Sequence, residues 1–247
     1  MSREHHSSRQ DQHHQGAAAG ADQLVQEFSD LARSLQAAAD TDRLLDEIVS
    51  AAVAMIPGVD EGSISVVLRR REVTSQSPSS QLPRLVDAVQ REVGEGPCLD
   101  AVFEQQAVRV PDMATERRWP RFAERAAKIG AASMLSFQLY VERDNLGALN
   151  LYGSRPNSFN DESERVGLLF ASHAAVAFAQ AQKLDQMAVG LDHRDVIGQA
   201  KGILMERYSI DAVPAFALLV RTSQHSNRKL RDVAEELCRT RRLNGLR

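Results

Sequence analysis

A cluster of three cations occupies residues 227–231, which read Asn-Arg-Lys-Leu-Arg. Asparagine ahead of an apolar helical pattern is typical of a helix start, so we expect Asn227 to cap a helix. Free backbone N–H groups at such an end bind anions, whereas the helix dipole there disfavours cations that lack a negative partner. The combination predicts a phosphate-binding corner. The alternative is a solvated basic face that Asp232 and Glu235 compensate.

Lys201 is a second candidate for contact with a polyanion, because small residues flank it in a helical stretch. These residues are Gly198, Ala200 and Gly202. A glycine costs roughly 1 kcal/mol relative to alanine inside a helix, so two of them indicate a specific need. The usual need is the close approach of another backbone, from a protein or a nucleic acid.

No catalytic constellation accompanies these cations. The sequence contains no Gly-rich phosphate loop of Walker or Rossmann spacing, no metal-type CxxC or HExxH and no GxSxG elbow. Glu235 and Glu236 are adjacent and therefore point apart on a helix, which argues against paired acid–base catalysis. We expect a protein that is not an enzyme, with no cofactor and no metal. The His pairs at 5–6 and 13–14 fit a solvated tail better than a chelating site.

Positive charge is concentrated at the C-terminal end of the chain. The formal net charge is −3, yet residues 221–247 hold 8 Lys or Arg against 3 Asp or Glu. A local excess of positive charge attracts a polyanion even when the mean charge is negative. The pattern favours a nucleic-acid partner for this end of the protein.

The composition bounds the class of protein. With 43% hydrophobic and 26% charged residues, the chain suits one medium and one small globular domain. No apolar run approaches the roughly 20 residues that cross a bilayer, and the N-terminus lacks a signal-peptide core. We therefore expect a cytoplasmic protein without membrane contact, in which Cys98 and Cys238 are free thiols.

The first two thirds of the chain alternate between helix and strand patterns. Residues 1–22 are polar and predict a disordered tail. Apolar spacing and turn residues predict helices at 23–56 and 82–92, from Pro97 and at 120–129, and strands at 63–68, 72–74, 108–110, 133–141 and 147–152. Strands interleaved with helices, and flanked by helices at both ends, describe an α/β sheet domain.

A long helix pattern follows, from the cap candidate Asn160 to about Arg207. Its apolar residues recur at intervals of four and three, which defines a heptad seam typical of a coiled coil in a homodimer. The seam comprises Phe170, Ala174, Ala177, Ala181, Leu184, Ala188 and Leu191. Packing on the protein's own sheet is an equal alternative for the first half. Beyond Gln182 a partner helix explains the pattern better.

Two shorter helices complete the chain. We expect Asp211 to cap the first, which carries Phe216 and Leu219, and Asn227 to cap the second, which carries Val233. With the end of the long helix they predict an all-α bundle of about 45 residues, and a fold this small gains from attachment to a dimeric stalk.

Three stretches of the C-terminal part resemble the ANTAR domain family: residues 197–207, Ala215-Phe216 with Leu219, and Ser223-Gln224 with residues 227–234. The resemblance covers about residues 185–240 and implies a dimer that binds pairs of RNA hairpins in nascent leader transcripts and promotes antitermination. It implies the RNA-facing residues Arg194, Lys201, Ser223, Gln224, Asn227, Arg228, Lys229 and Arg231, and the core residues Ile197, Ala200, Leu204, Phe216, Leu219, Leu230, Val233 and Ala234. The chain departs from the family at Val213-Pro214, where acidic residues are usual.

The preceding part is similar to the GAF domains of actinobacterial regulators. The similarity covers about residues 23–183 and rests on residues 94–101, 118–122, 133–136, 147–152 and 158–159. It implies an antiparallel sheet flanked by helices that holds a small-molecule ligand or serves as a dimerisation platform. Cys98 is either a redox or chromophore thiol or a buried cysteine at a helix start, and the second fits the usual burial of free cysteine.

These expectations combine into one hypothesis. The chain has a tail (1–22), a GAF domain (23–183), an ANTAR RNA-binding domain (184–240) and a basic tail (241–247). It is expected to be a signal-responsive antitermination regulator whose partners are RNA stem-loops and a second copy of itself. A DNA-binding transcription regulator with a GAF sensor is the alternative, because three small helices can imitate a helix-turn-helix. An enzyme such as a free methionine sulfoxide reductase is disfavoured, because that chemistry uses several cysteines and this region has Cys98 alone.

Overall fold

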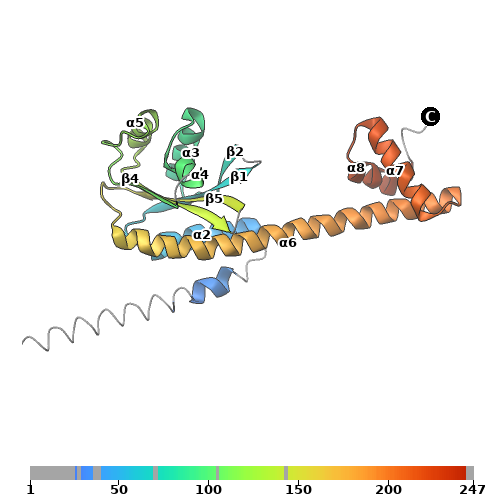
Figure 1. The fold of residues 1–247 in the computed structure, drawn as a ribbon, viewed down its shortest axis with the longest axis horizontal. Coiled ribbons are helices and arrows are strands. Elements are labelled where there is room, and N and C mark those ends of the chain that lie inside the picture. Colours follow the sequence, from blue (N-terminus) through green and yellow to red (C-terminus); the bar gives the residue numbers. More distant parts are fainter. Residues whose placement is uncertain are drawn as a thin grey trace, which may run out of the picture. The chain divides into compact units, whose positions relative to one another are not determined.

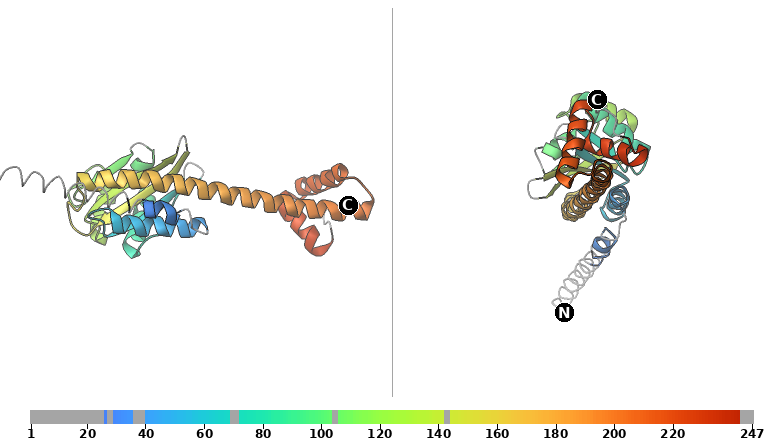
Figure 2. Two further views of the ribbon diagram at one scale, coloured as in Figure 1. Left: turned by 90° about the horizontal axis from the view of Figure 1, so that it is seen from below. Right: turned by 90° about the vertical axis from the view of Figure 1, so that its right-hand side faces the viewer.

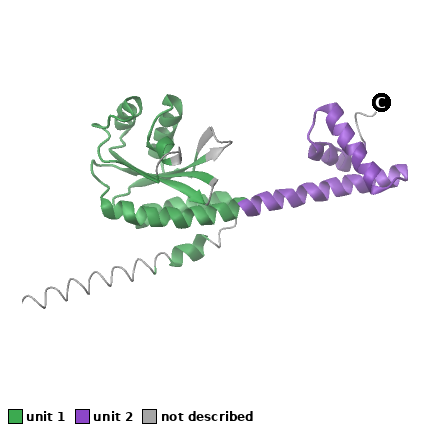
Figure 3. Ribbon diagram, viewed as in Figure 1, with its two compact units in different colours: residues 1–182 green, residues 183–247 purple. Residues whose placement is uncertain are grey.

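A computed structural model describes residues 26, 29–35, 40–68, 72–103, 106–141 and 144–242. The chain divides into two compact units, residues 1–182 and 183–247 (Figure 3). The expected tail at 1–22, with its His pairs, and most of the basic tail lie outside the described residues. No helix in the described ranges is long and apolar enough to span a membrane.

The first unit is an antiparallel sheet between two layers of helices. Its elements are α2 (Thr41–Met55), β1 (Glu61–Leu68), β2 (Glu72–Gln76), α3 (Gln81–Val93), α4 (Pro97–Phe103), β3 (Ala107–Val110), α5 (Pro120–Ile129), β4 (Ser133–Val141), β5 (Asp144–Gly153) and the first part of α6 (Asp161–Tyr208). The five strands lie in the order β2-β1-β5-β4-β3, and every neighbouring pair is antiparallel. Helices α2 and α6 cover one face, and α3, α4 and α5 cover the other (Figures 1 and 2). The predicted α/β class is confirmed.

Two hydrophobic cores form because successive strand residues point to opposite faces of the sheet. On β4, Leu135 and Phe137 are fully buried in the core that α2 and α6 close, whereas Met134 belongs to the core under α3, α4 and α5. On β5, Leu149 faces the first core and Ala148 the second. The alternating pattern of the sequence thus builds both layers at once.

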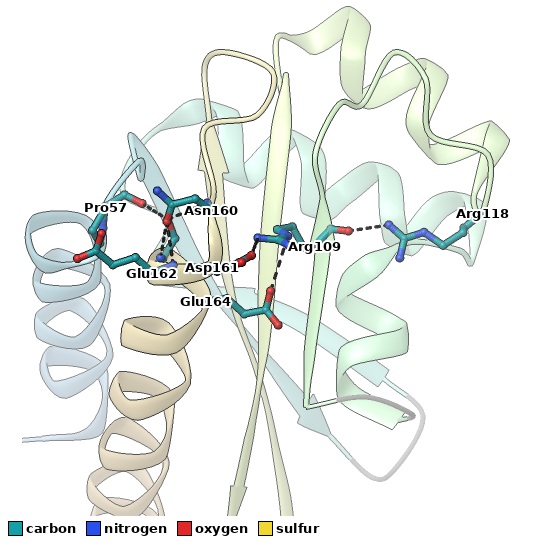
Figure 4. A network of polar contacts seen from close by, with 8 residues as sticks. Pro57, Arg109, Arg118, Asn160, Asp161, Glu162 and Glu164 are labelled. Atoms are coloured by element: carbon teal, nitrogen blue, oxygen red, sulfur yellow. Dashed lines mark hydrogen bonds and ion pairs between the residues drawn. The ribbon is translucent and has the colours of Figure 1, made fainter.

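The start of α6 is fixed by local polar contacts (Figure 4). The Asn160 side chain accepts hydrogen bonds from the backbone N–H groups of Glu162 and Ser163, each at 2.9 Å, which confirms the predicted cap. Arg109 of β3 forms ion pairs with Asp161 at 3.0 Å and Glu164 at 3.6 Å. Carboxylates in the first turn also suit the helix dipole, so this end of α6 is held to the sheet in a defined register.

The second unit contains the rest of α6, α7 (Ala212–Ser226) and α8 (Leu230–Thr240). These three helices share one core, formed by Ala200, Leu204, Ala215, Leu219, Val233, Ala234 and Leu237, with Ile197 and Leu230 packed against it. Phe216, predicted in this core, is 42% exposed, so that prediction is wrong. The buried stripe of α7 runs through Ala215, Leu219 and Thr222, at helical intervals of four and three, and Phe216 lies beside it.

Several element boundaries differ from the sequence prediction, among them the starts of the last helix and of β5. Asn227 was expected to begin the last helix, but it ends α7 in the left-handed conformation at φ 50°, and Lys229 is the N-cap of α8. Asparagine suits both positions, because it caps helix starts and also tolerates the left-handed region. β5 begins at Asp144, three residues earlier than expected.

The predicted heptad seam divides between the two units. Phe170 and Ala174 are fully buried in the core of their own unit, and Ala177 and Ala181 pack partly against it. Phe170 and Ala174 are therefore not available to a partner helix. They pack on the protein's own sheet, as the alternative interpretation predicted. In the second unit Leu184 is 66% and Leu191 59% exposed, and Ala188 is exposed as well.

Candidate functional site

One face of α6 in the second unit carries Arg194, Gly198, Lys201 and Gly202. Arg194 and Lys201 are seven residues apart, which places them on the same side of the helix about 10 Å from each other. Arg194 is exposed and Lys201 half-buried, and neither side chain forms a hydrogen bond or ion pair within the described residues. Ile197, Ala200 and Leu204 point to the bundle core instead. The face therefore presents two unneutralised cations.

The glycines of this face have no packing reason among the described residues. A Cβ placed on Gly198 or on Gly202 would meet nothing within 4 Å among the described residues. At Gly167, in the first part of the same helix, a Cβ would lie 2.2 Å from Cζ of Phe137. Gly167 is thus required by the fold, whereas Gly198 and Gly202 leave an open strip of backbone beside Lys201.

The connection between α7 and α8 is closed by hydrogen bonds around Ser223. Its Oγ donates to the carbonyl oxygen of Arg228 at 2.6 Å, and its own carbonyl accepts from the Arg228 N–H at 3.1 Å. The Asn227 N–H donates to the Gln224 carbonyl at 3.4 Å. These bonds use backbone groups and the Ser223 hydroxyl, so the exposed side chains of Gln224, Asn227 and Lys229 remain available to a ligand.

Arg228 and Arg231 are committed to carboxylates of the protein. Arg228 forms an ion pair with Glu236, and its guanidinium also lies 3.5 Å from the Asp232 carbonyl oxygen. Arg231 pairs with Glu235 at 2.6 Å, and this hydrogen bond raises the pKa of Arg231 above its ordinary value. The predicted RNA-facing set thus contains two paired arginines, beside cations that form no ion pair in the ranges the structure describes. The alternative interpretation, a basic face neutralised by neighbouring carboxylates, thus applies to Arg231, whose charge Glu235 balances.

Arg231 also ties α8 to α6. Its guanidinium lies 3.3 Å from the Asp192 carboxylate and 2.9 Å from Nε2 of His193, both on α6. Asp192 and His193 directly precede Arg194, so the tie brings the start of α8 to the beginning of the α6 face. No side-chain hydrogen bond or ion pair joins Lys201 to the α7–α8 connection in the ranges that the structure describes.

A cavity of about 170 Å³ lies in the first unit, beneath α3 and α4. It is lined by Ser65, Ser75, Asp87, Gln90, Arg91, Gly94, Cys98 and Leu99. The buried Asp87 carboxylate accepts hydrogen bonds from Ser63 at 2.7 Å, Ser75 at 2.6 Å and the Tyr152 hydroxyl at 2.8 Å. Ser75 and Asp87 of the cavity wall thus belong to a connected polar cluster that gathers side chains from β1, β2, α3 and β5.

Burial controls the ionisation of this cluster. Desolvation raises the pKa of Asp87 above its ordinary value, although the hydrogen bonds from Ser75, Ser63 and Tyr152 oppose it. Burial, with the nearby Asp87 charge, raises the pKa of the Cys98 thiol to about 12. Cys98 is therefore protonated at neutral pH and 2% exposed, as expected for a core cysteine and not for a reactive thiolate.

Sequence reasoning missed this cavity. The available signal was polar residues at alternating positions inside apolar strands, as at Ser63 and Ser65 of β1 and Asn150 of β5. Asp87 adds a carboxylate between the apolar Val86 and Val89 of α3. Buried polar residues in such positions need partners, so their presence on three elements indicated a shared cluster.

The two units match two known families. The GAF domain family matches residues 38–179, and the ANTAR domain family matches residues 185–237. Because the GAF match spans more than half of the chain, the protein belongs to the GAF domain family, and it carries an ANTAR domain after it. An ANTAR domain implies an RNA-binding antitermination regulator, here with a GAF sensor. This architecture is typically non-enzymatic, although some GAF relatives are enzymes.

Solved structures share the fold of the first unit at low sequence identity. A free methionine-R-sulfoxide reductase from Neisseria meningitidis superposes with a TM-score of 0.53 and 14% identity, over 65% of this chain and 91% of that chain. A phosphoenolpyruvate-protein phosphotransferase GAF domain from Coxiella burnetii gives 0.52 and 16%, over 66% and 96%. An N-acylhomoserine lactone dependent LuxR family transcription factor from Burkholderia cenocepacia gives 0.51 and 23%, over 64% and 95%. Identities this low show the fold alone. A comparison with curated proteins finds no match.

Proposed function

We propose that the protein is a homodimeric, signal-responsive regulator that binds pairs of hairpins in nascent leader transcripts and promotes antitermination. The observation that carries this proposal is the open strip of α6, where Gly198 and Gly202 expose the backbone beside Lys201, which has no ion pair within the described part of the chain. We retain residues 23–183 as the GAF domain and 184–240 as the RNA-binding domain. The division into two units and the two family matches support these bounds.

The chemistry of the face suits an RNA loop. Lysine and arginine hold phosphates, whereas amide side chains such as Gln224 and Asn227 can read the edges of splayed bases. The proposed RNA-binding set is Arg194, Lys201, Ser223, Gln224, Asn227, Arg228, Lys229 and Arg231. The exposed rings of Phe216 (42%) and Tyr208 (49%) add surfaces on which bases could stack, which the sequence did not predict for Phe216.

The second half of the seam supports a dimer. Leu184 and Leu191 of the predicted seam are each more than half exposed, and Ala188 between them is exposed as well. Met187, also more than half exposed, lies three residues after Leu184 and four before Leu191 and widens the apolar stripe. An apolar stripe on an isolated helix is typical of pairing with a second helix, and two copies of this chain would present identical stripes. A ligand that binds one arrangement of the GAF units better than another would bias the paired helices, and through them the RNA-binding faces.

The test is RNA binding by Lys201→Ala, measured by fluorescence anisotropy on an RNA pool of two linked stem-loops with randomised loops. Loss of a charge-assisted phosphate contact is expected to weaken binding at least about tenfold and to lower the slope of log K against log salt by roughly one. Lys183→Ala, an exposed lysine earlier on α6, is the matched control and should bind as the wild type does. Circular dichroism checks that both variants are folded.

Two results would contradict the proposal. Unchanged RNA affinity in Lys201→Ala would remove this residue from the site. Displacement of the RNA pool by an equal concentration of duplex DNA would instead favour the DNA-binding regulator.

A further inference from the structure

Helix α8 carries acidic side chains close in sequence to the cations at its start. Asp232, Glu235 and Glu236 follow Arg228, Lys229 and Arg231 within nine residues. On a surface that binds a polyanion, nearby carboxylates repel the ligand, so the positions of these carboxylates affect how strongly a polyanion binds there. The two arginines that pair with Glu235 and Glu236 differ in the contacts that hold them.

Arg231 is held from two helices. It contacts Glu235 within α8, and Asp192 and His193 of α6. If an RNA phosphate replaced one of these partners, the other contacts would still hold the Arg231 guanidinium in place. Within the proposed RNA-binding set, Arg231 therefore also positions the start of α8 on α6, and its contact with Glu235 belongs to that positioning.

Arg228 is held differently. Its backbone is fixed by Ser223 through two hydrogen bonds, at 2.6 and 3.1 Å, so the residue stays in place when its side chain changes partner. The guanidinium has one carboxylate partner, Glu236, from two turns further along α8. The Arg228 side chain is 43% exposed and that of Glu236 21%, so solvent and ligands reach the arginine from the open side.

A phosphate can take the place of this carboxylate. Both groups present two oxygen acceptors to the planar guanidinium fork, so the exchange preserves the hydrogen-bonding geometry of Arg228. A solvent-accessible ion pair is weak enough for a ligand to break, yet a ligand that gains only this one contact recovers little by doing so. An RNA that engages several cations at once overcomes the competition, whereas a loosely bound polyanion does not.

We propose that Glu236 covers Arg228 in the RNA-free protein and that a phosphate of the bound RNA displaces this carboxylate. Glu236 then acts as a specificity-determining residue, because it disfavours weak binding of unrelated polyanions to the α7–α8 connection. The inference rests on the proposed RNA-binding function and names a competition within its site.

The experiment is a double-mutant cycle of RNA affinity, with wild type, Glu236→Gln, Arg228→Ala and the double variant. Affinity is measured for the pool of linked stem-loops and for a polyuridine strand of the same length. Glu236→Gln is expected to bind polyuridine roughly two- to fivefold more tightly than wild type, the range that an accessible ion pair allows. In the Arg228→Ala background the same substitution should change affinity much less. Glu235→Gln, which alters the same charge one residue away, is the matched control and should give a smaller gain.

An equal gain from Glu236→Gln with and without Arg228, an equal gain from Glu235→Gln, or no gain would overturn the inference. Should Arg228→Ala lower the melting temperature, Arg228→Gln replaces it in the cycle. Binding that depends on Lys201 but is indifferent to Glu236 refutes the inference alone, whereas binding that never depends on Lys201 refutes the proposed site as well.

Discussion

Gly167 in α6 tests the packing of the long helix on the sheet. Replacing it by alanine would place a Cβ 2.2 Å from Cζ and 2.4 Å from Cε2 of Phe137, a ring that is fully buried in the core under α2 and α6. Atoms cannot approach this closely, so either the ring or the helix must shift. Overpacking of this kind costs about 1–3 kcal/mol, whereas the helix gains at most about 1 kcal/mol from the added methyl group. We therefore expect Gly167→Ala to lower the free energy of unfolding by about 1–2 kcal/mol.

The assay is urea unfolding followed by far-UV circular dichroism and by the fluorescence of Trp119, the single tryptophan, which lies in the first unit. Gly190→Ala is the matched control on the same helix, because a Cβ there meets nothing within 4 Å, and it should stabilise its unit by up to about 1 kcal/mol. Phe137→Leu makes room for the new methyl group, so its cost should be smaller in the Gly167→Ala background than in the wild type. Wild-type stability in Gly167→Ala, or additive effects of the two substitutions, would refute the contact.

Three further predictions follow from the contacts described. Gly202→Ala should stabilise the free protein by about 0.5–1 kcal/mol yet weaken RNA binding, measured by thermal unfolding and anisotropy; unchanged binding would show that no ligand approaches this strip. Arg231→Ala should lower the melting temperature of the second unit, and Arg231→Lys should restore it only in part because lysine lacks the fork that reaches both helices; a full rescue would contradict the tie. Desolvation raises the folded-state pKa of Asp87 above 3.8, so its contribution to stability is present below that pH and is lost as pH rises through the raised value. The unfolding free energy of wild type minus that of Asp87→Asn should therefore fall as pH rises from 4, and a rise would contradict the burial of this carboxyl.

Local signals in the sequence were sufficient to predict α6 and β4. The cap at Asn160 and an apolar period without proline predicted α6, and the structure places it at Asp161–Tyr208. The apolar run from Ser133 to Val141 predicted β4 with its observed ends. Such patterns can be recognised in the sequence because capping and periodic apolar spacing involve residues only a few positions apart along the chain.

Some local sequence patterns are compatible with two structural positions, and tertiary contacts determined which position was adopted. Asn227 suits a helix start as well as a left-handed helix end, and the pairing of Ser223 with Arg228 selects the helix end. The spacing of Phe170 and Ala174 suits a partner helix as well as the protein's own sheet, and burial against β4 and β5 selects the sheet. The same spacing at Leu184 and Leu191 lies in the second unit and remains exposed.

The sites show the same division. The sequence by itself determined the residue types of the basic surface, namely Lys201 in its glycine setting and the cations from Arg228 to Arg231, because composition and helical spacing are visible along the chain. Only the tertiary structure decided that Arg228 contacts Glu236 while Lys201 contacts no opposite charge among the residues the structure describes. It likewise decided that Asp87 contacts Tyr152, which lies 65 residues later on β5. These contacts depend on which helices and strands pack together. Burial of the whole hydrophobic core determines that packing, and no single pair of contacting polar residues does.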